Sequence, residues 1–350
     1  MSNTFFITGV QRSGTTLLSF ILGNHPEVHL DNYSIAFRLI TCFKNYEKVL
    51  PYNLQHDKKE VLKWLIKKDY KGRLAELLDV NLLSQTTDIK QLVEKSIEQK
   101  LQQNKKTAWG DKSPNLQYYI PDLLQLLPNA KIIHIVRDGR ATANSMSKRS
   151  KKNLRLSAQA WVDGNIVALV NQDILGASQF KIIRYEDLIE KSEETIKSVC
   201  DFIGISFQAE MLDLSESTLT TNSNSYVKGK LDASKLYAYQ EQLSPKQLQR
   251  IENIQADLLE KLDYLLLSKE RLETHQLSVY QKIRLNQADN LKQLFRTRQE
   301  RMDNWQTQKV RIPLSKRLYG FLRIWSSDFL SKSLLDQLFK TKELRDKKMK

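Results

Sequence analysis

Cysteine is scarce in this sequence, with two residues among 350. Cys42 and Cys200 stand far apart, and neither lies in a CxxC or other metal-ligand spacing. The sequence therefore predicts neither a disulfide framework nor a cysteine-ligated metal site. We expect both cysteines to be buried free thiols, which suits a reducing cytoplasm.

Long apolar runs are also missing. No basic-then-apolar leader precedes Phe5, and no stretch of about 18 apolar residues is present to span a bilayer. We find no internal repeat. These features predict a cytoplasmic protein, with any membrane contact limited to its surface.

Acidic charge is deficient, mainly in one region. The formal net charge is +15. Residues 268–350 hold 20 Lys and Arg against 9 Asp and Glu, a net charge of +11, which leaves +4 for residues 1–267. Because the basicity is concentrated in the tail, it says little about the chemistry of the rest. We predict a main domain of residues 1–267 and a basic helical C-terminal extension of residues 268–350.

Alternating strand and helix patterns indicate an α/β fold. Residues 4–8 form a short β-rich run ending at Gly9, and residues 15–22 have a helical pattern. Residues 131–136 and 180–188 are two further apolar strands, each followed by a helical pattern. This alternation predicts a central parallel sheet flanked by helices, of the P-loop NTPase-like kind.

A polar and mainly helical segment interrupts this alternation at about residues 31–104. It contains no glycine cluster, and the stretches VLKWLIKK and LVEKSIEQKL both keep helical spacing. The stretch WGDKSP then breaks the helical pattern. We predict a helical cap inserted into the main domain.

The segment Gly9–Thr16, GVQRSGTT, follows the first strand and has the spacing of a phosphate-binding loop. In such a loop, backbone N–H groups and the N-terminus of the next helix converge on an anion. The lysine that reaches the β- and γ-phosphates in kinases and nucleotide hydrolases is missing, because Thr15 occupies its position. An ordinary strand-to-helix turn is the alternative interpretation, but the small hydroxyl residues of SGTT favour an anion site.

A magnesium-binding carboxylate is missing as well. The strand of residues 131–136 ends at Arg137, and an arginine is a poor metal partner and a good phosphate partner. Arg137 follows a parallel strand, where ligands bind in such sheets, and Ser145 comes two helical turns later. Asp138 has no second ligand at metal-binding spacing. The sequence therefore predicts a nucleotide held by arginines, without a bound metal ion.

Four ordered stretches resemble the sulfotransferase family: GVQRSGTTLL, WGDKSPN, IIHIVRDGRATANSMSKR and RYEDL. They look most like the branch that contains protein-tyrosine sulfotransferases and their bacterial relatives. The resemblance covers roughly residues 5–267 and implies a P-loop-like α/β fold. It also implies a transferase that uses 3′-phosphoadenosine-5′-phosphosulfate (PAPS) as cosubstrate and releases the bisphosphate PAP.

The resemblance implies that the loop holds the 5′-phosphosulfate. The loop residues concerned are Arg12, Ser13, Gly14, Thr15 and Thr16. Lys112, in the stretch GDKSP, would lie by the sulfuryl group. Arg12 and Lys112 would then be catalytic, because cations placed there stabilise charge on the leaving phosphate.

The resemblance also implies a second set of nucleotide contacts. Arg137 and Ser145 would hold the 3′-phosphate, and Arg149, one helical turn further on, would assist. Tyr185, at the end of the third predicted strand, would contact the nucleotide. The residues of a loop closing over the cofactor would be Ser225, Lys228 and Lys230.

The general base departs from the family pattern. The family places a glutamate shortly after its His-Pro pair, but Tyr33 stands at that position here. We predict Asp31, two residues away, as the catalytic base. His29 and His56 are the alternatives, because a neutral imidazole is a competent base near pH 7.

The basic tail contains the stretch LYGFLRIWSSDFLSKSLLDQLFK, whose apolar residues recur at helical spacing. It predicts either a basic helix resting on anionic lipid, a peripheral membrane contact, or a helix packed on the main domain or a partner chain. No nucleic-acid recognition module accompanies the charge, which argues against nucleic acid as a partner.

Together the motifs predict a PAPS-dependent sulfotransferase (EC 2.8.2.-) acting by in-line transfer without metal. The acceptor is a hydroxyl group on a carbohydrate, a small metabolite or a peptide tyrosine, and the sequence does not choose among them. One alternative is a P-loop kinase or nucleotide hydrolase, which would need Mg²⁺ and the missing lysine. The other is a catalytically silent, membrane-associated PAP-binding protein, which the missing glutamate favours.

Overall fold

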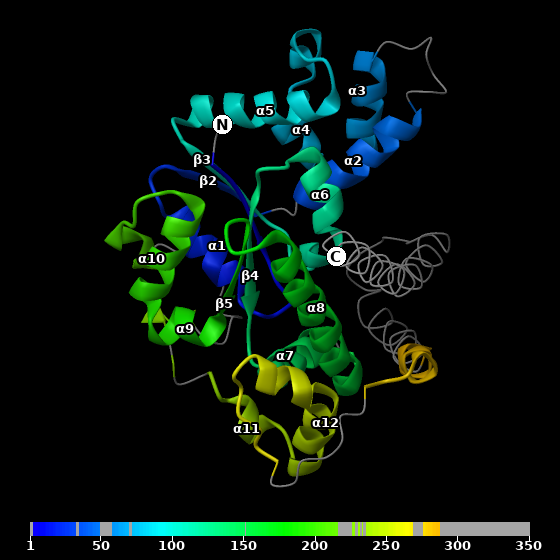
Figure 1. Cartoon of the computed structure of the whole chain (residues 1–350), viewed down its shortest axis with the longest axis vertical. Coiled ribbons are helices and arrows are strands. Elements are labelled where there is room, and N and C mark those ends of the chain that lie inside the picture. Colours follow the sequence, from blue (N-terminus) through cyan, green and yellow to red (C-terminus); the bar gives the residue numbers. More distant parts are fainter. Residues whose placement is uncertain are drawn as a thin grey trace, which may run out of the picture. The chain divides into compact units, whose positions relative to one another are not determined.

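The structure is a computed structural model of the chain (Figure 1). It describes residues 3–32, 35–49, 58–69, 72–150, 152–215, 226–227, 230–231, 233, 236–268 and 276–287. The chain divides into two units, Met1–Val279 and Tyr280–Lys350. The strands and helices named below belong to the first unit. The apolar helix predicted in the tail lies outside the described residues, and the domain boundary near residue 267 stays a prediction.

Five parallel strands form one sheet in the order β2-β3-β1-β4-β5. They are β1 Asn3–Thr8, β2 Val28–Asp31, β3 Ala108–Lys112, β4 Lys131–Val136 and β5 Phe180–Arg184. Ile7 of β1 is in register with Lys112 of β3 and with Ile133 of β4. The predicted α/β fold with a central parallel sheet is confirmed.

Helices cover both faces of the sheet (Figure 1). Successive side chains of β1 point to opposite faces, so Phe6 joins one hydrophobic cluster and Phe5 and Ile7 join the other. The cluster with Phe5 is completed by α1 Thr15–Gly23, α9 Tyr185–Glu190 and α10 Ser192–Ile203. The cluster with Phe6 includes side chains of the cap, of α6 Ile120–Leu126 and of α8 Leu154–Leu175.

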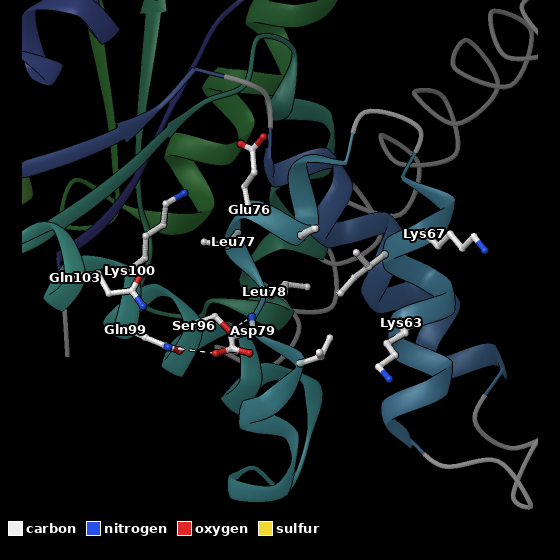
Figure 2. A pocket seen from close by; sticks show the side chains of 13 residues that line it. Lys63, Lys67, Glu76, Leu77, Leu78, Asp79, Ser96, Gln99, Lys100 and Gln103 are labelled. Carbon is white, nitrogen blue, oxygen red and sulfur yellow. Dashed lines mark hydrogen bonds between the residues drawn. The ribbon is translucent and has the colours of Figure 1, made fainter.

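The predicted helical cap is present between β2 and β3. Its elements are α2 Ile35–Val49, α3 Lys58–Lys68, α4 Arg73–Leu77, the 3₁₀ helix η1 Val80–Gln85 and α5 Ile89–Asn104. A cavity of about 540 Å³ lies among α3, α4 and α5 (Figure 2). On one wall Gln99 Nε2 donates a hydrogen bond of 3.2 Å to Asp79 Oδ2, and none of the predicted nucleotide-binding residues lines this cavity.

Strands β2 and β3 have no clear signal in the sequence. They read VHLD and AWGDK: the first alternates over only four residues, and the second shows neither a continuous apolar run nor a regular alternation. The burial of β3 from Ala108 to Asp111 comes instead from its place between β1 and β2. Tertiary position, rather than local pattern, makes these residues strands.

The strand predicted for residues 180–188 is wrong beyond Arg184. Strand β5 ends there, and Tyr185 begins helix α9. Glu186 and Asp187 occupy the first turn of this helix, where carboxylates interact favourably with the helix dipole. The acidic pair after the aromatic residue was therefore a helix-start signal.

The remaining elements all follow β3 along the chain. They are η2 Leu116–Tyr119, α7 Gly139–Ser150, η3 Ala209–Leu212, β6 Tyr226–Val227, β7 Lys230–Leu231, α11 Tyr239–Gln242 and α12 Pro245–Lys261. Ser244 and Gln247 form a reciprocal capping box at the start of α12. Within the part of the chain that the structure describes, no helix combines the length and apolar character needed to cross a bilayer.

Candidate nucleotide-binding site

The phosphate-binding loop connects β1 to α1 and passes close to β4 and α9. A Cβ atom on Gly9 would lie 2.5 Å from the carbonyl oxygen of Ile135, so only glycine fits there. Gly14 has a φ of 107°, and its Cβ would lie 2.2 Å from Cδ2 of Tyr185. Arg12 has a φ of 73°, a left-handed conformation that is uncommon for a residue with a side chain and is often found at functional sites.

Helix α1 begins at Thr15, directly after this loop. Thr15 is buried and Thr16 is exposed. The first helical hydrogen bond joins Leu18 N to Gly14 O at 3.2 Å, and among the described side chains none caps this helix start. The first backbone N–H groups of α1 are thus available to an anion at the loop.

Several polar atoms of the described residues are buried without a hydrogen-bond partner, and two of them belong to the loop and to the end of the neighbouring strand β4. These two are Ser13 Oγ in the loop and Arg137 Nε directly after β4. A buried polar group without a partner costs about 1–3 kcal/mol, so such groups are rare and call for a partner from outside the chain. Together with the close-fitting glycines, these atoms suit an anionic group such as a phosphosulfate.

Three arginines gather beside the loop. Arg12 Nε donates to Ser145 Oγ at 3.1 Å, which joins the loop to α7. Arg12 is exposed at the surface, and its pKa is lowered, first by partial desolvation and then by the charges of Arg149 and Arg137. Like charges this close destabilise one another until an anion lies among them. The structure thus brings these four residues together, and their binding roles stay predictions.

Arg137 is held in place by α8 and α9. Its guanidinium carbon lies 4.5 Å from the centre of the Tyr185 ring, a cation–π contact. Its carbonyl oxygen accepts a hydrogen bond of 2.8 Å from Trp161 Nε1, and the next N–H group, of Asp138, donates to Glu186 Oε1 at 2.9 Å. Tyr185 is 4% exposed and supports Arg137 from the first turn of α9, directly after β5, and its contact with the nucleotide stays a prediction.

Lys112 ends strand β3 beside the strand that leads into the loop. Burial lowers its pKa. The residues that follow Lys112 are attached to that neighbouring strand, because Ser113 N donates to Ile7 O and Asn115 N donates to Gly9 O, both at 2.9 Å. Lys112 therefore lies at the same edge of the sheet as the phosphate-binding loop.

A hydrogen-bonded pair that no motif marks joins β1 to η2. Thr8 Oγ1 donates to Gln117 Oε1 at 2.9 Å and accepts from Leu116 N at 3.0 Å. Thr8 and Gln117 are both 0% exposed. The two residues are 109 positions apart, and no local pattern links them. The sequence shows only that each of these buried positions holds a polar residue.

Asp31, the predicted base, ends β2 within a buried ion pair. Its carboxylate accepts from Lys100 Nζ at 3.0 Å and from Trp109 Nε1 at 2.8 Å, and His29 Nε2 lies 3.6 Å away. Burial acts to raise the pKa of Asp31, but the contact with His29 and the charge of Lys100 outweigh burial and lower it. Strand β3 separates β2 from β1, so about two strand spacings, or roughly 10 Å, lie between Asp31 and the strand of the loop.

Asp111, to which the sequence analysis gives no role although it lies in the stretch GDKSP, precedes Lys112 and is fully buried. It accepts hydrogen bonds from the backbone N–H groups of Ile35 at 3.0 Å and Ala36 at 3.1 Å, and from Ser113 Oγ at 2.5 Å. Burial raises its pKa to about 6. Asp111 thus caps the first helix of the helical cap and attaches it to the sheet.

Asp138 belongs to a buried charge network. Its Oδ2 accepts from Arg140 Nη2 at 2.7 Å and from the Tyr239 hydroxyl at 3.0 Å. Arg140 Nη1 donates to Glu252 Oε1 at 2.6 Å and to the carbonyl oxygen of Leu265 at 2.8 Å. The network attaches α12 and the segment after it to the start of α7, and it occupies the carboxylate of Asp138.

Some predicted residues fall outside the described part of the chain. They are Ser225, Lys228 and the alternative base His56. Lys230 belongs to β7, which pairs with β6. A role for this segment in covering a nucleotide therefore stays a prediction.

Comparison with known proteins places this geometry in context. The model of the sulfotransferase family matches residues 4–209, more than half of the chain. Protein-tyrosine sulfotransferase A of Caenorhabditis elegans is 26% identical over 248 residues, covering 64% of this chain and 57% of that protein. Protein-tyrosine sulfotransferase 2 of Gallus gallus is 28% identical over 215 residues, covering 59% of this chain and 52% of that protein. The chain thus spans little more than half the length of these relatives.

Solved structures are also among the proteins to which this chain is similar. The sulfotransferase domain of the Synechococcus PCC 7002 olefin synthase aligns with a TM-score of 0.49 and 22% identity. The alignment covers 75% of this chain and 95% of that domain.

Proposed function

We propose that this chain, which belongs to the sulfotransferase family, transfers a sulfuryl group from PAPS to a hydroxyl acceptor. The observation that carries the proposal is the pair of buried atoms without a partner, Ser13 Oγ and Arg137 Nε, within a cluster of three arginines. A bisphosphorylated nucleotide has two anionic ends, which suit the loop and the arginine cluster respectively. Thr15 in place of the lysine and Arg137 in place of a metal-binding carboxylate argue against the kinase or hydrolase alternative.

The chain's own groups divide the binding between them. The amide groups of the loop and the start of α1, with the side chains of Ser13 and Thr16, would hold the 5′-phosphosulfate. Arg137 and Ser145, with Arg149, would hold the 3′-phosphate. Tyr185 would fix the orientation of Arg137 through the stacking contact of 4.5 Å.

Catalysis would rest on two cations. When bound, PAPS supplies an activated sulfuryl group on a phosphate that becomes the leaving group. Arg12 is oriented by its hydrogen bond to Ser145, and Lys112 is positioned at the end of β3. Both would stabilise negative charge on the leaving phosphate, so that positioning and electrostatics provide most of the rate enhancement.

Asp31 would remove the proton from the acceptor hydroxyl. Its lowered pKa keeps the carboxylate ionised at neutral pH. His29, whose Nε2 lies 3.6 Å from this carboxylate, is the alternative base.

One observation supports a second candidate, a catalytically silent PAP-binding protein. Both oxygens of Asp31 are engaged, by Lys100 and by Trp109. Such contacts are typical of a structural ion pair, and a carboxylate with a lowered pKa is a weak base.

Two measurements on the full chain test the proposal. Isothermal titration of PAP in the presence of EDTA should show saturable binding to one site, and ATP should compete poorly. Radiolabelled PAPS should then transfer its sulfuryl group to one of three acceptor classes: an oligosaccharide, a small alcohol or phenol, or a tyrosine peptide. PAP binding without transfer to any acceptor would favour the silent protein, and the absence of PAP binding would rule out both.

A further inference from the structure

The end of strand β1 is attached sideways to η2 by side chains. Thr8, the last residue of β1, uses its hydroxyl both to donate to Gln117 Oε1 and to accept from Leu116 N. The next residue, Gly9, accepts from Asn115 N at 2.9 Å through its carbonyl oxygen. The first residue of the phosphate-binding loop is therefore held by the segment 115–117.

Helix α8 holds this segment from its other side. Asn171 Nδ2 donates to the carbonyl oxygen of Gln117 at 2.8 Å. Gly164 of the same helix lies so close that a Cβ atom on it would be 2.6 Å from Val10 Cγ2 and 2.9 Å from Gln117 Nε2. The loop, η2 and α8 thus meet at one tightly packed point.

Gln117 makes this arrangement at a cost in stability. Its side chain is fully buried, and among the described residues its Nε2 has no hydrogen-bond partner. An apolar side chain of similar length would avoid the penalty of about 1–3 kcal/mol for an unmet buried donor. Within the described part of the chain, the hydrogen bond to Thr8 is the interaction of this side chain that an apolar residue could not replace.

We propose that Gln117 is a positioning residue for the phosphate-binding loop and acts on it through Thr8. The inference rests on the proposed function, in which this loop holds the 5′ end of the nucleotide. When the Thr8–Gln117 bond fixes the end of β1, the backbone N–H groups of the loop stay directed at one point. Without the bond, Gly9 and the residues after it lose that common direction, and binding weakens before chemistry does.

Four variants of the full chain test the proposal by isothermal titration of PAP. Gln117→Met removes both polar atoms and keeps the length of the side chain, and Thr8→Val removes the hydroxyl and keeps the branching. Thr8→Ser retains the hydroxyl. Gln179→Met is the matched control, because Gln179 braces the carbonyl oxygens of Pro128 and Ala130 before β4, at the opposite end of that strand from Arg137.

Gln117→Met and Thr8→Val should each raise the Kd for PAP by about tenfold, the value of one hydrogen bond within a buried pair. Thr8→Ser and Gln179→Met should leave the Kd unchanged. In steady-state kinetics the KM for PAPS should rise more than kcat falls, which a purely structural role would not produce.

Unchanged PAP affinity in Gln117→Met would overturn the inference and leave the proposed function standing. A Kd that rises equally in Gln179→Met, in step with a lower Tm, would also overturn it. If Thr8→Val does not fold, Gln117→Met and Thr8→Ser decide the matter. A wild-type chain that does not bind PAP would remove the proposed function itself, and with it this role.

Discussion

Arg137 and Arg140 are three residues apart, and their surroundings are opposite. Arg140 is 3% exposed and donates to Asp138, Glu252 and the carbonyl oxygen of Leu265. Arg137 has a buried Nε without a hydrogen-bond partner among the described residues, and its guanidinium lies on the ring of Tyr185. The described residues provide acceptors for the guanidinium of Arg140, whereas they leave Arg137 Nε without one.

The pKa directions agree with this difference. Burial acts to lower the pKa of Arg140, but Asp138 and then Glu252 raise it above its usual value. The pKa of Arg12, next to Arg137 and Arg149, is lowered by partial desolvation and by its cationic neighbours. A network of opposite charges stabilises the fold, while a cluster of like charges stabilises a bound anion at some expense to the fold.

The largest effect is expected on replacing Arg140, the arginine that is fully paired within the protein. Arg140→Ala leaves the carboxylates of Asp138 and Glu252 buried without their cation, which should lower the free energy of unfolding by about 3–5 kcal/mol. Urea unfolding followed by circular dichroism measures it. Lys63→Ala, which removes an exposed pair with Glu60, is the control and should change stability by less than about 1 kcal/mol. An Arg140→Ala chain as stable as the wild type would contradict the structural role.

A second prediction concerns Asp111, a buried carboxylate that, unlike Asp138, has no arginine paired with it among the described residues. Its contribution to stability should therefore depend on pH. Its folded-state pKa of about 6 is above the ordinary 3.8, so folding favours the protonated form. Its contribution to stability is complete below pH 4 and is lost as the pH rises through 6, by about 3 kcal/mol. The stability of the wild type relative to Asp111→Asn should therefore fall between pH 4 and pH 7. A constant difference across that range would show that Asp111 is ionised throughout.

The sequence predicted those elements of the fold and of the candidate site that depend on local pattern. Continuous apolar runs identified β1 and β4, and the spacing from Gly9 to Thr16 identified the loop. Strands β2 and β3 escaped prediction because their burial comes from neighbouring strands. The network of Arg140 and Glu252 joins residues 112 positions apart, and no local pattern encodes such a pair.

The candidate base shows the same limit. Asp31 was predicted from its distance along the chain from the position of the family's glutamate. Only the fold places Lys100 of α5 and Trp109 of β3 against its carboxylate. Lys100 lies in the segment predicted as the helical cap, and Trp109 lies in the stretch WGDKSP that ends the helical pattern. Nothing in the sequence indicates that both side chains reach Asp31, so the ion pair could not be predicted.

A third prediction concerns Arg12, which belongs to the cluster of like charges. Arg12→Ala should lower kcat by about 10²-fold, because Arg12 is expected to stabilise charge that develops in the transition state. Steady-state transfer from PAPS measures it, with Tm as the check on folding. The Tm should stay constant or rise, since the substitution removes repulsion with Arg137 and Arg149. A lower Tm with unchanged kcat would place Arg12 among the structural residues instead.

The smallest expected effect concerns Arg149, the most peripheral member of the cluster. Arg149 is exposed, so solvent and salt screen its charge. Arg149→Ala should weaken PAP binding by only about two- to fivefold at low salt, corresponding to less than about 1 kcal/mol, and by less at high salt. A loss as large as that of Arg137→Ala, insensitive to salt, would mean that Arg149 is a direct ligand.

Titration of PAP in EDTA into the wild type and Arg137→Ala tests the central claim most directly. The account predicts saturable binding to the wild type and a Kd higher by about 10- to 100-fold in Arg137→Ala, the value of a hydrogen bond to a charged group, with unfolding unchanged. Equal affinity in the two chains, or binding that appears only when Mg²⁺ is added, would contradict it.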